Sequence, residues 1–185
     1  NEGMHVEPML VQEIQDQNGK VLQRFDPTME QVIRKESAQL VRYMLEGVIH
    51  ESGTGSSLLY GEGDILLPKD NRYARVFAGK TGTTSNHSDG WFIGMSHNLI
   101  SGVWVGGDDR AIHFRSWSAG QGAKTARPIW AKFMAKVYDD KSLGYTKGAF
   151  PRPERPLSIE IDCDKYEFDS QQNAGFDYDA KKNDF

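Results

Sequence analysis

The sequence predicts an α+β fold in which helices flank an antiparallel β-sheet. Three runs with strand character follow one another between residues 75 and 105, and only three polar residues separate the last two. Apolar residues recur at helical spacing from Ser37 to Glu51, before these runs, and from Thr125 to Tyr138, after them. Strands that are adjacent in sequence, with helices outside them, are typical of an antiparallel α+β sheet.

The composition is that of a globular protein. Of 185 residues, 38% are hydrophobic and 26% are charged, and the formal net charge is −4. A nucleic-acid-binding surface is basic, so no nucleic-acid partner is expected. No apolar run approaches the roughly 20 residues of a membrane-spanning helix, and we recognise no signal peptide at the start. Cys163 is the only cysteine, which excludes a disulfide within the chain.

The segment from Met9 to Arg24 is expected to form a β-hairpin. Asn18-Gly19 lies between two extended runs, and both residue types tolerate the positive φ of a tight turn. Leu10, Ile14 and Val21 supply apolar strand positions.

The segment from Ser37 to Glu51 is expected to be a helix that is buried along one side. Its apolar positions form two adjacent rows with four-residue spacing: Leu40, Met44, Val48 and Val41, Leu45, Ile49. Ser37 is a suitable N-cap residue. Gly53-Thr54-Gly55 ends the helix, since glycine permits the closing left-handed residue.

Next comes a segment of mixed character, from Ser56 to Tyr73, which we interpret as a surface loop with a short helical turn at Ser56–Tyr60. The three strands that follow it are expected at Arg75 to Thr84, Trp91 to Met95 and Leu99 to Val105. Ser96-His97-Asn98 is short enough that the last two strands should form a tight antiparallel hairpin.

The second helix is expected from Thr125 to Tyr138, with its N-cap near Thr125 and Pro128 in the first turn, where proline is tolerated. Its predicted buried face comprises Ala126, Ile129, Trp130, Phe133 and Val137. From Lys147 the chain changes to a proline-containing linker and an acidic tail. We therefore expect a folded part over residues 1–146 and an extension over residues 147–185.

The segment Ala78-Gly79-Lys80-Thr81-Gly82-Thr83-Thr84, at the end of the first strand, has binding chemistry. Its glycines leave room for an extended peptide beside the strand, while the lysine charge and the threonine hydroxyls suit a carboxylate. A phosphate-binding P-loop would need glycine where Ala74 stands, so that alternative is rejected. From spacing alone, a solvated lysine that protects a sheet edge explains the residues about as well as a ligand site.

Lys80-Thr81-Gly82 is the third signature motif of penicillin-binding proteins and serine β-lactamases. The surrounding order is more specific and resembles the class A, bifunctional penicillin-binding proteins. The segments that carry this resemblance are Leu45-Glu46-Gly47-Val48-Ile49, Gly53-Thr54-Gly55, Asp89-Gly90-Trp91-Phe92-Ile93-Gly94, Val103-Trp104-Val105-Gly106, and Ala126-Arg127-Pro128-Ile129-Trp130 with Phe133-Met134. The resemblance covers about Glu7 to Tyr138 and identifies the C-terminal part of the transpeptidase domain.

The resemblance implies a five-stranded antiparallel sheet and a serine D,D-transpeptidase that acts on D-Ala-D-Ala stem peptides of peptidoglycan and is acylated by β-lactams. It implies that Lys80 and Thr83 are catalytic, Lys80 through the proton-transfer network and Thr83 through a backbone N–H of the oxyanion hole. Thr81, Gly82, Thr83 and Thr84 are implied in substrate binding, with Thr81 and Thr83 on the terminal carboxylate. No metal or cofactor is implied.

The nucleophile of this family is a serine in a Ser-x-x-Lys motif, and no serine of the chain has lysine three residues later. Ser96-His97-Asn98 matches the second motif as a string, but it follows Lys-Thr-Gly instead of preceding it, so we interpret it as a turn. We therefore expect the chain alone to be inactive and its partner to be the preceding half of the same domain. The parent would carry an N-terminal membrane anchor and act outside the cytoplasmic membrane.

Two alternatives remain at the level of sequence. The chain could be a non-catalytic module whose exposed strand binds peptide C-termini, or a fragment of a serine β-lactamase, which the residues after Lys-Thr-Gly disfavour. The histidines show no metal-ligand spacing; they are His5, His50, His87, His97 and His113.

Overall fold

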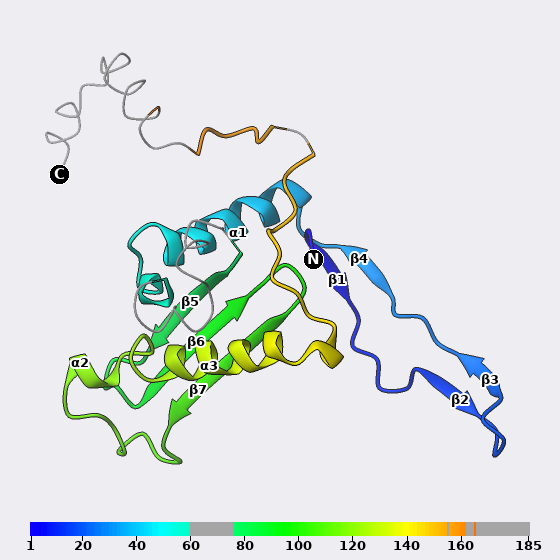
Figure 1. Cartoon of the computed structure of the whole chain (residues 1–185), viewed down its shortest axis with the longest axis horizontal. Helices are drawn as coiled ribbons and strands as arrows, with labels where there is room; N and C mark the ends of the chain where they lie inside the picture. Colours follow the sequence, from blue (N-terminus) through cyan, green and yellow to red (C-terminus); the bar gives the residue numbers. More distant parts are fainter. Residues whose placement is uncertain (60–75, 155, 162–164, 166–185) are drawn as a thin grey trace, which may run out of the picture. The chain divides into compact units, whose positions relative to one another are not determined.

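The computed structural model describes residues 1–59, 76–154, 156–161 and 165. The chain divides into a unit from Asn1 to Arg152 and a second unit from Pro153 onward. The first unit contains an antiparallel sheet in the order β5-β6-β7, formed by β5 (Ala78–Thr83), β6 (Asp89–Met95) and β7 (Ile100–Gly106) (Figure 1). This combination of helices with an antiparallel sheet is the predicted α+β class. Of the five strands that the resemblance implies, the described residues form these three in one sheet.

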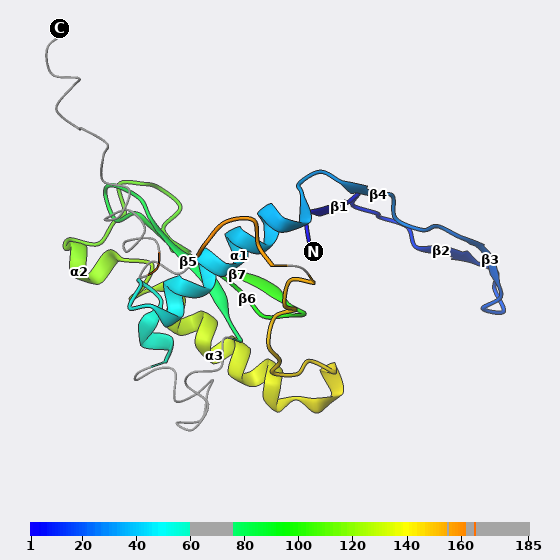
Figure 2. The same ribbon diagram turned by 90° about the horizontal axis from the view of Figure 1, so that it is seen from above.

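Helix α3 (Ala126–Asp139) packs across one face of the sheet (Figures 1 and 2). The ring of Trp130 lies at its centre, with ring centroids 5.2 Å from Phe92 and 5.6 Å from Phe77. Its indole Nε1 donates to Ser101 Oγ at 2.8 Å, so the only polar atom of this buried ring is satisfied. A Cβ at Gly94 would lie 2.4 Å from the same ring, and glycine is therefore required there for close packing.

The predicted N-cap of α3 at Thr125 is confirmed, but the predicted buried face is partly wrong. Ile129 and Phe133 keep 49% and 46% of their surface exposed. The buried residues of the helix are Ala126, Arg127, Trp130, Ala131, Met134, Ala135, Val137 and Tyr138. The alanines in this set let the helix approach the sheet closely around Trp130, which rotates the two large apolar side chains outward.

Helix α1 (Lys35–His50) begins earlier than predicted. The N–H of Ala38 already donates to the carbonyl of Arg34 at 3.1 Å, so Arg34 is the N-cap and the assignment of Ser37 as N-cap is wrong. The helix packs against β5 and buries Ile49, whereas Val41 and Met44 remain exposed. The short η1 helix (Ser56–Leu58) confirms the expected helical turn; residues 60–75, including Arg75, lie outside the described residues.

The N-terminal hairpin is confirmed and is longer than predicted. Strands β2 (Glu13–Gln15) and β3 (Val21–Arg24) form the expected pair, and β1 (Met4–Val6) and β4 (Met29–Gln31) extend it (Figure 1). The turn is a loop of three residues between Asp16 and Lys20, with Gly19 at φ +80°. This is the arrangement of a turn followed by a left-handed residue, not the two-residue turn that Asn-Gly suggests.

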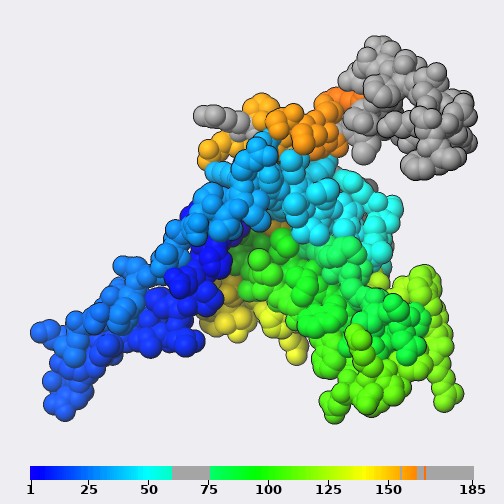
Figure 3. All heavy atoms as spheres, turned by 180° about the vertical axis from the view of Figure 1, so that it is seen from behind, coloured from blue at the N-terminus to red at the C-terminus, as the bar shows by residue number. Residues whose placement is uncertain are grey.

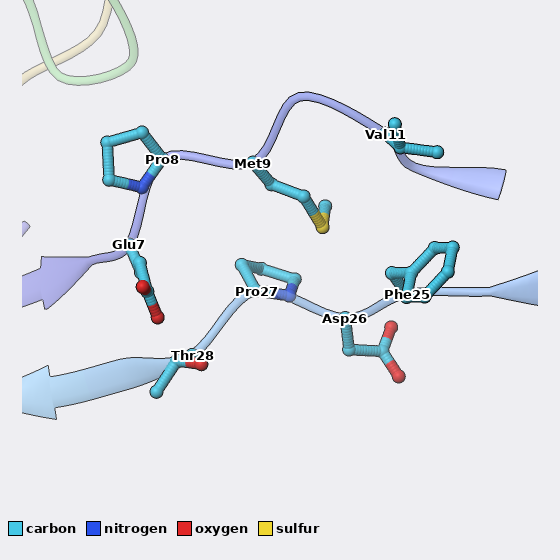
Figure 4. A pocket seen from close by; sticks show the side chains of 8 residues that line it. All are labelled: Glu7, Pro8, Met9, Val11, Phe25, Asp26, Pro27 and Thr28. Atoms are coloured by element: carbon cyan, nitrogen blue, oxygen red, sulfur yellow. The ribbon is translucent and has the colours of Figure 1, made fainter.

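Between the two ladders of this hairpin lies a hollow of about 250 Å³ (Figure 4). Pro8 and Pro27 line it, one from each chain segment. Because proline has no N–H to donate, the ladder is interrupted at this level.

The predicted tight turn between β6 and β7 is confirmed by the bond from Ser96 N to Leu99 O, at 2.8 Å. Two further short helices, α2 (Trp117–Gly120) and η4 (Lys141–Leu143), were not predicted. In the portion of the chain that is described, no helix combines the length and the apolar character needed to cross a bilayer. The predicted division at residues 146 and 147 stays a prediction.

Candidate functional site

Lys80 and the residues after it lie on β5, which is an edge strand of the sheet. Thr81 pairs with Phe92 and Thr83 with Gly90, so these two threonines project from the face that α3 covers. Lys80 and Gly82 belong to the opposite face, across from Ile93 and Trp91. Lys80 and Thr83 are exposed, and Thr81 and Gly82 are partly exposed. The predicted residues are thus accessible along one edge.

Along β5, the backbone N–H and C=O groups of successive residues point alternately toward β6 and toward the open edge. Thr84 N donates to Asp89 O at 3.1 Å, so the backbone N–H and C=O of Thr84 point toward β6. In an antiparallel pair, neighbouring residues alternate between groups that bond the partner strand and groups that point away from it. The N–H groups of Thr81 and Thr83 are therefore directed away from β6.

The ammonium of Lys80 bends over the same edge. Its Nζ donates to Thr81 O at 3.0 Å and lies 3.5 Å from Thr81 Oγ1. The hydroxyl of Thr81 is also 2.9 Å from that of Thr54, in the loop after α1. One ammonium and two hydroxyls thus meet at the strand edge, a donor set that suits a carboxylate.

The hydroxyl of Thr83 is held by the segment that leads into α3. Gly122 N donates to Thr83 Oγ1 at 3.0 Å, so this hydroxyl oxygen has one lone pair satisfied and can direct its own hydrogen elsewhere. Gly122 sits so close to the sheet that a Cβ there would be 2.4 Å from Gly82 O.

Thr84 faces a different environment. Its hydroxyl accepts from Asp89 N at 3.0 Å and pairs with Ser88 Oγ at 2.9 Å, so it stabilises the β5–β6 turn. Asp89 also accepts from Trp104 Nε1 at 3.0 Å. This indole donor, followed by the Ser88 hydroxyl, lowers the pKa of the Asp89 carboxyl below its ordinary 3.8. The role of Thr84 in substrate binding stays a prediction, and these bonds do not favour it.

Three residues that contact the site were not among the predicted site residues: Thr54, Gly122 and Arg127. Arg127 is buried in the first turn of α3 and donates from Nη1 to Thr54 O at 3.0 Å. The sequence pattern assigns Thr54 to the turn that ends the first helix. The only available signal was its place between two glycines, Gly53 and Gly55, which indicates a tightly packed backbone.

The face of the sheet opposite α3 carries large exposed apolar side chains. Trp91 and Trp104 are 44% and 46% exposed, and their ring centroids lie 6.5 Å apart. Ile93 and Ile100 are exposed beside them. Figure 3 shows the sheet from this side, in green below α1. A groove of about 740 Å³ lies between α1, the first residues of the chain and the Ser96–Asn98 turn.

Within the residues that the structure describes, His, Cys, Asp and Glu side chains do not gather in groups of three that could hold a metal ion. His87 has φ +55° and lies against Gly120 beside the β5–β6 turn.

Comparison with known proteins identifies the family of the chain. The family model "Penicillin binding protein transpeptidase domain" matches residues 1–129. Penicillin-binding protein 1A of Aquifex aeolicus is 34% identical over 137 residues, which are 74% of this chain and 17% of that protein. Penicillin-binding protein 1A of Pseudomonas aeruginosa is 33% identical over 152 residues, 81% of this chain and 16% of that protein. The chain thus spans less than a quarter of the length of these relatives.

The crystal structure of penicillin-binding protein 1A from Haemophilus influenzae superposes with a TM-score of 0.59 and 26% sequence identity, over 85% of this chain and 25% of that one. The similarity therefore extends to the arrangement of strands and helices. With the family model covering most of the chain, these findings show that the chain belongs to the penicillin-binding protein transpeptidase family.

Proposed function

We propose that this chain supplies the Lys-Thr-Gly strand of a peptidoglycan D,D-transpeptidase. The observation that carries the proposal is the edge of β5, where the Lys80 ammonium and the Thr81 hydroxyl come together and the Thr83 hydroxyl follows two residues later. This edge suits the terminal carboxylate of a D-Ala-D-Ala stem peptide, or the carboxylate of a β-lactam, which lies in a similar position relative to the scissile amide.

In this proposal Thr83 acts through two groups. Its hydroxyl binds the carboxylate, and its backbone N–H, which points away from β6, donates to the oxyanion that forms when serine attacks the carbonyl. Removing one such donor from an acyl-transfer enzyme costs about 100- to 1,000-fold in rate. Lys80 provides the positive field that orients the anion and assists proton transfer, and Gly82 leaves the strand uncovered for an extended peptide.

The serine nucleophile is proposed to come from the preceding part of the same domain. The sequence has no Ser-x-x-Lys, and the curated relatives are several times longer than the chain. The exposed apolar face around Trp91 and Trp104, which lies on the side of the sheet from which Lys80 projects, is suited to be covered by that part. In the parent protein we expect a membrane anchor and an active site outside the cytoplasmic membrane.

A fluorescent penicillin tests the proposal. It is added to the chain alone and to the chain combined with the preceding part of the transpeptidase domain, and covalent labelling is located by mass spectrometry. We expect labelling only of the combination, on a serine of the preceding part. An assembled combination that remains unlabelled would exclude the transpeptidase and favour a non-catalytic peptide-binding module. Labelling of the isolated chain would place the nucleophile within it.

A further inference from the structure

We infer that Thr54, on the loop after α1, is a positioning residue for the carboxylate site of β5, and that it acts by orienting the hydroxyl of Thr81. The inference rests on the proposed function. Its basis is the 2.9 Å contact between Thr54 Oγ1 and Thr81 Oγ1, which joins segments 27 residues apart in sequence.

The loop that carries Thr54 packs closely on the end of α1. Gly55 N donates to Val48 O at 2.9 Å, which folds the loop back on the last turn of α1. A Cβ at Gly53 would lie 2.4 Å from the same carbonyl oxygen, so the loop can be this close only because glycine occupies that position. These contacts fix the backbone at Thr54, from which the hydroxyl reaches Thr81.

A second element fixes the same loop from the other side. Arg127 is only 4% exposed, and its guanidinium donates to the Thr54 carbonyl at 3.0 Å. A charged donor to a carbonyl makes one of the stronger hydrogen bonds in proteins. The first turn of α3 thus sets the distance between the Thr54 loop and β5.

The contact with Thr54 determines where the hydroxyl hydrogen of Thr81 points. When Thr54 donates to Thr81 Oγ1, the hydrogen of Thr81 is free to point toward an anion at the strand edge. A chain of donors in which each hydroxyl polarises the next is stronger than isolated bonds. Lys80 Nζ, 3.5 Å from the same oxygen, adds positive charge on the side where the anion would lie.

The test compares Thr54→Val with Thr54→Ser in the transpeptidase domain that contains this chain, with Thr28→Val as a control at an exposed threonine of the N-terminal hairpin. Acylation is measured with a penicillin and with the methyl ester of the same penicillin, which lacks the carboxylate. We expect Thr54→Val to weaken the binding constant for the acid about 3- to 10-fold, and to change that for the ester less. Thr54→Ser and Thr28→Val should resemble wild type.

Two results would overturn the inference while leaving the proposed function intact: Thr54→Val that equals wild type with the acid, or an equal loss with acid and ester, which indicates a structural role. Wild-type domain that neither compound acylates would overturn the proposed function and this inference with it.

Discussion

Replacement of Gly122 by alanine tests whether the segment before α3 controls the β5 edge. A Cβ at this position would lie 2.3 Å from Trp91 O and 2.4 Å from Gly82 O. Both oxygens belong to the backbone of paired strands, so they cannot move aside as a flexible side chain can. Carbon and oxygen atoms in close contact normally lie about 3.3 Å apart or more, and the segment must therefore retreat by about 1 Å.

That retreat lengthens the bond from Gly122 N to Thr83 Oγ1 from its present 3.0 Å to beyond hydrogen-bonding distance. A lost hydrogen bond costs about 0.5–1.5 kcal/mol and overpacking about 1–3 kcal/mol. We expect Gly122→Ala to destabilise the transpeptidase domain by about 2–4 kcal/mol in urea unfolding. We also expect slower penicillin acylation at temperatures where the variant is still folded, because the Thr83 hydroxyl has lost its anchor.

Gly47→Ala, in α1, is the matched control. A Cβ at Gly47 would meet Glu51 Oε2 at 3.0 Å, which is the end of a flexible side chain that can shift. Alanine is favoured over glycine inside a helix by about 1 kcal/mol, so this variant should be at least as stable as wild type and should be acylated normally. If Gly122→Ala melts and reacts like Gly47→Ala, the close packing of this segment on β5, and its role in orienting Thr83, are refuted.

Three further outcomes are expected. Thr83→Val should lower the rate of penicillin acylation about tenfold, measured by stopped-flow, whereas Thr83→Ser should retain most of it, because serine keeps the hydroxyl and both variants keep the backbone N–H. Gly94→Ala should lower the urea midpoint by the equivalent of about 1–3 kcal/mol, since its methyl group collides with the buried Trp130 ring; an unchanged midpoint would contradict this packing. Asp89→Asn should lower the melting temperature at neutral pH. The pKa of Asp89, lowered chiefly by Trp104, contributes stability above the ordinary value of 3.8 that is lost as the pH falls through the lowered pKa. Wild-type and variant melting temperatures should therefore converge in acid, and a constant difference across pH would contradict the assignment.

Local sequence patterns predict the fold correctly where contacts between neighbours in sequence determine the structure. The Ser96-His97-Asn98 turn and the hairpin around Gly19 follow from short breaks between extended runs. The start of α1 was missed because N-cap preference favours serine, while the helix begins at Arg34 without such a side chain. A prediction from hydrophobicity alone places Ile129 on the buried face of α3, but this residue is exposed. The small alanine side chains of the helix determine which of its sides can approach the sheet.

The candidate site shows the same division. The Lys-Thr-Gly strand could be recognised because its residues are contiguous and their order is specific to a family. The contacts that orient its hydroxyls could not, since Thr54 is 27 residues before Thr81 and Gly122 is 39 residues after Thr83. Their meeting depends on how closely α3 and the loop after α1 approach β5, and tertiary packing around Trp130 sets that approach.

In the proposed mechanism, the segment around the start of α3 orients the two hydroxyls that bind the carboxylate. Gly122 orients the Thr83 hydroxyl directly, and Arg127 acts on the Thr81 hydroxyl through Thr54. Both effects arise within this chain, so in the proposed mechanism the carboxylate-binding hydroxyls are oriented by residues of this chain. Preorganised donors lose less free energy when the charge arrives than donors that must be ordered then. In the proposed mechanism the preceding part of the domain supplies the serine and its proton-transfer partners, and variants at Gly122 should weaken carboxylate binding.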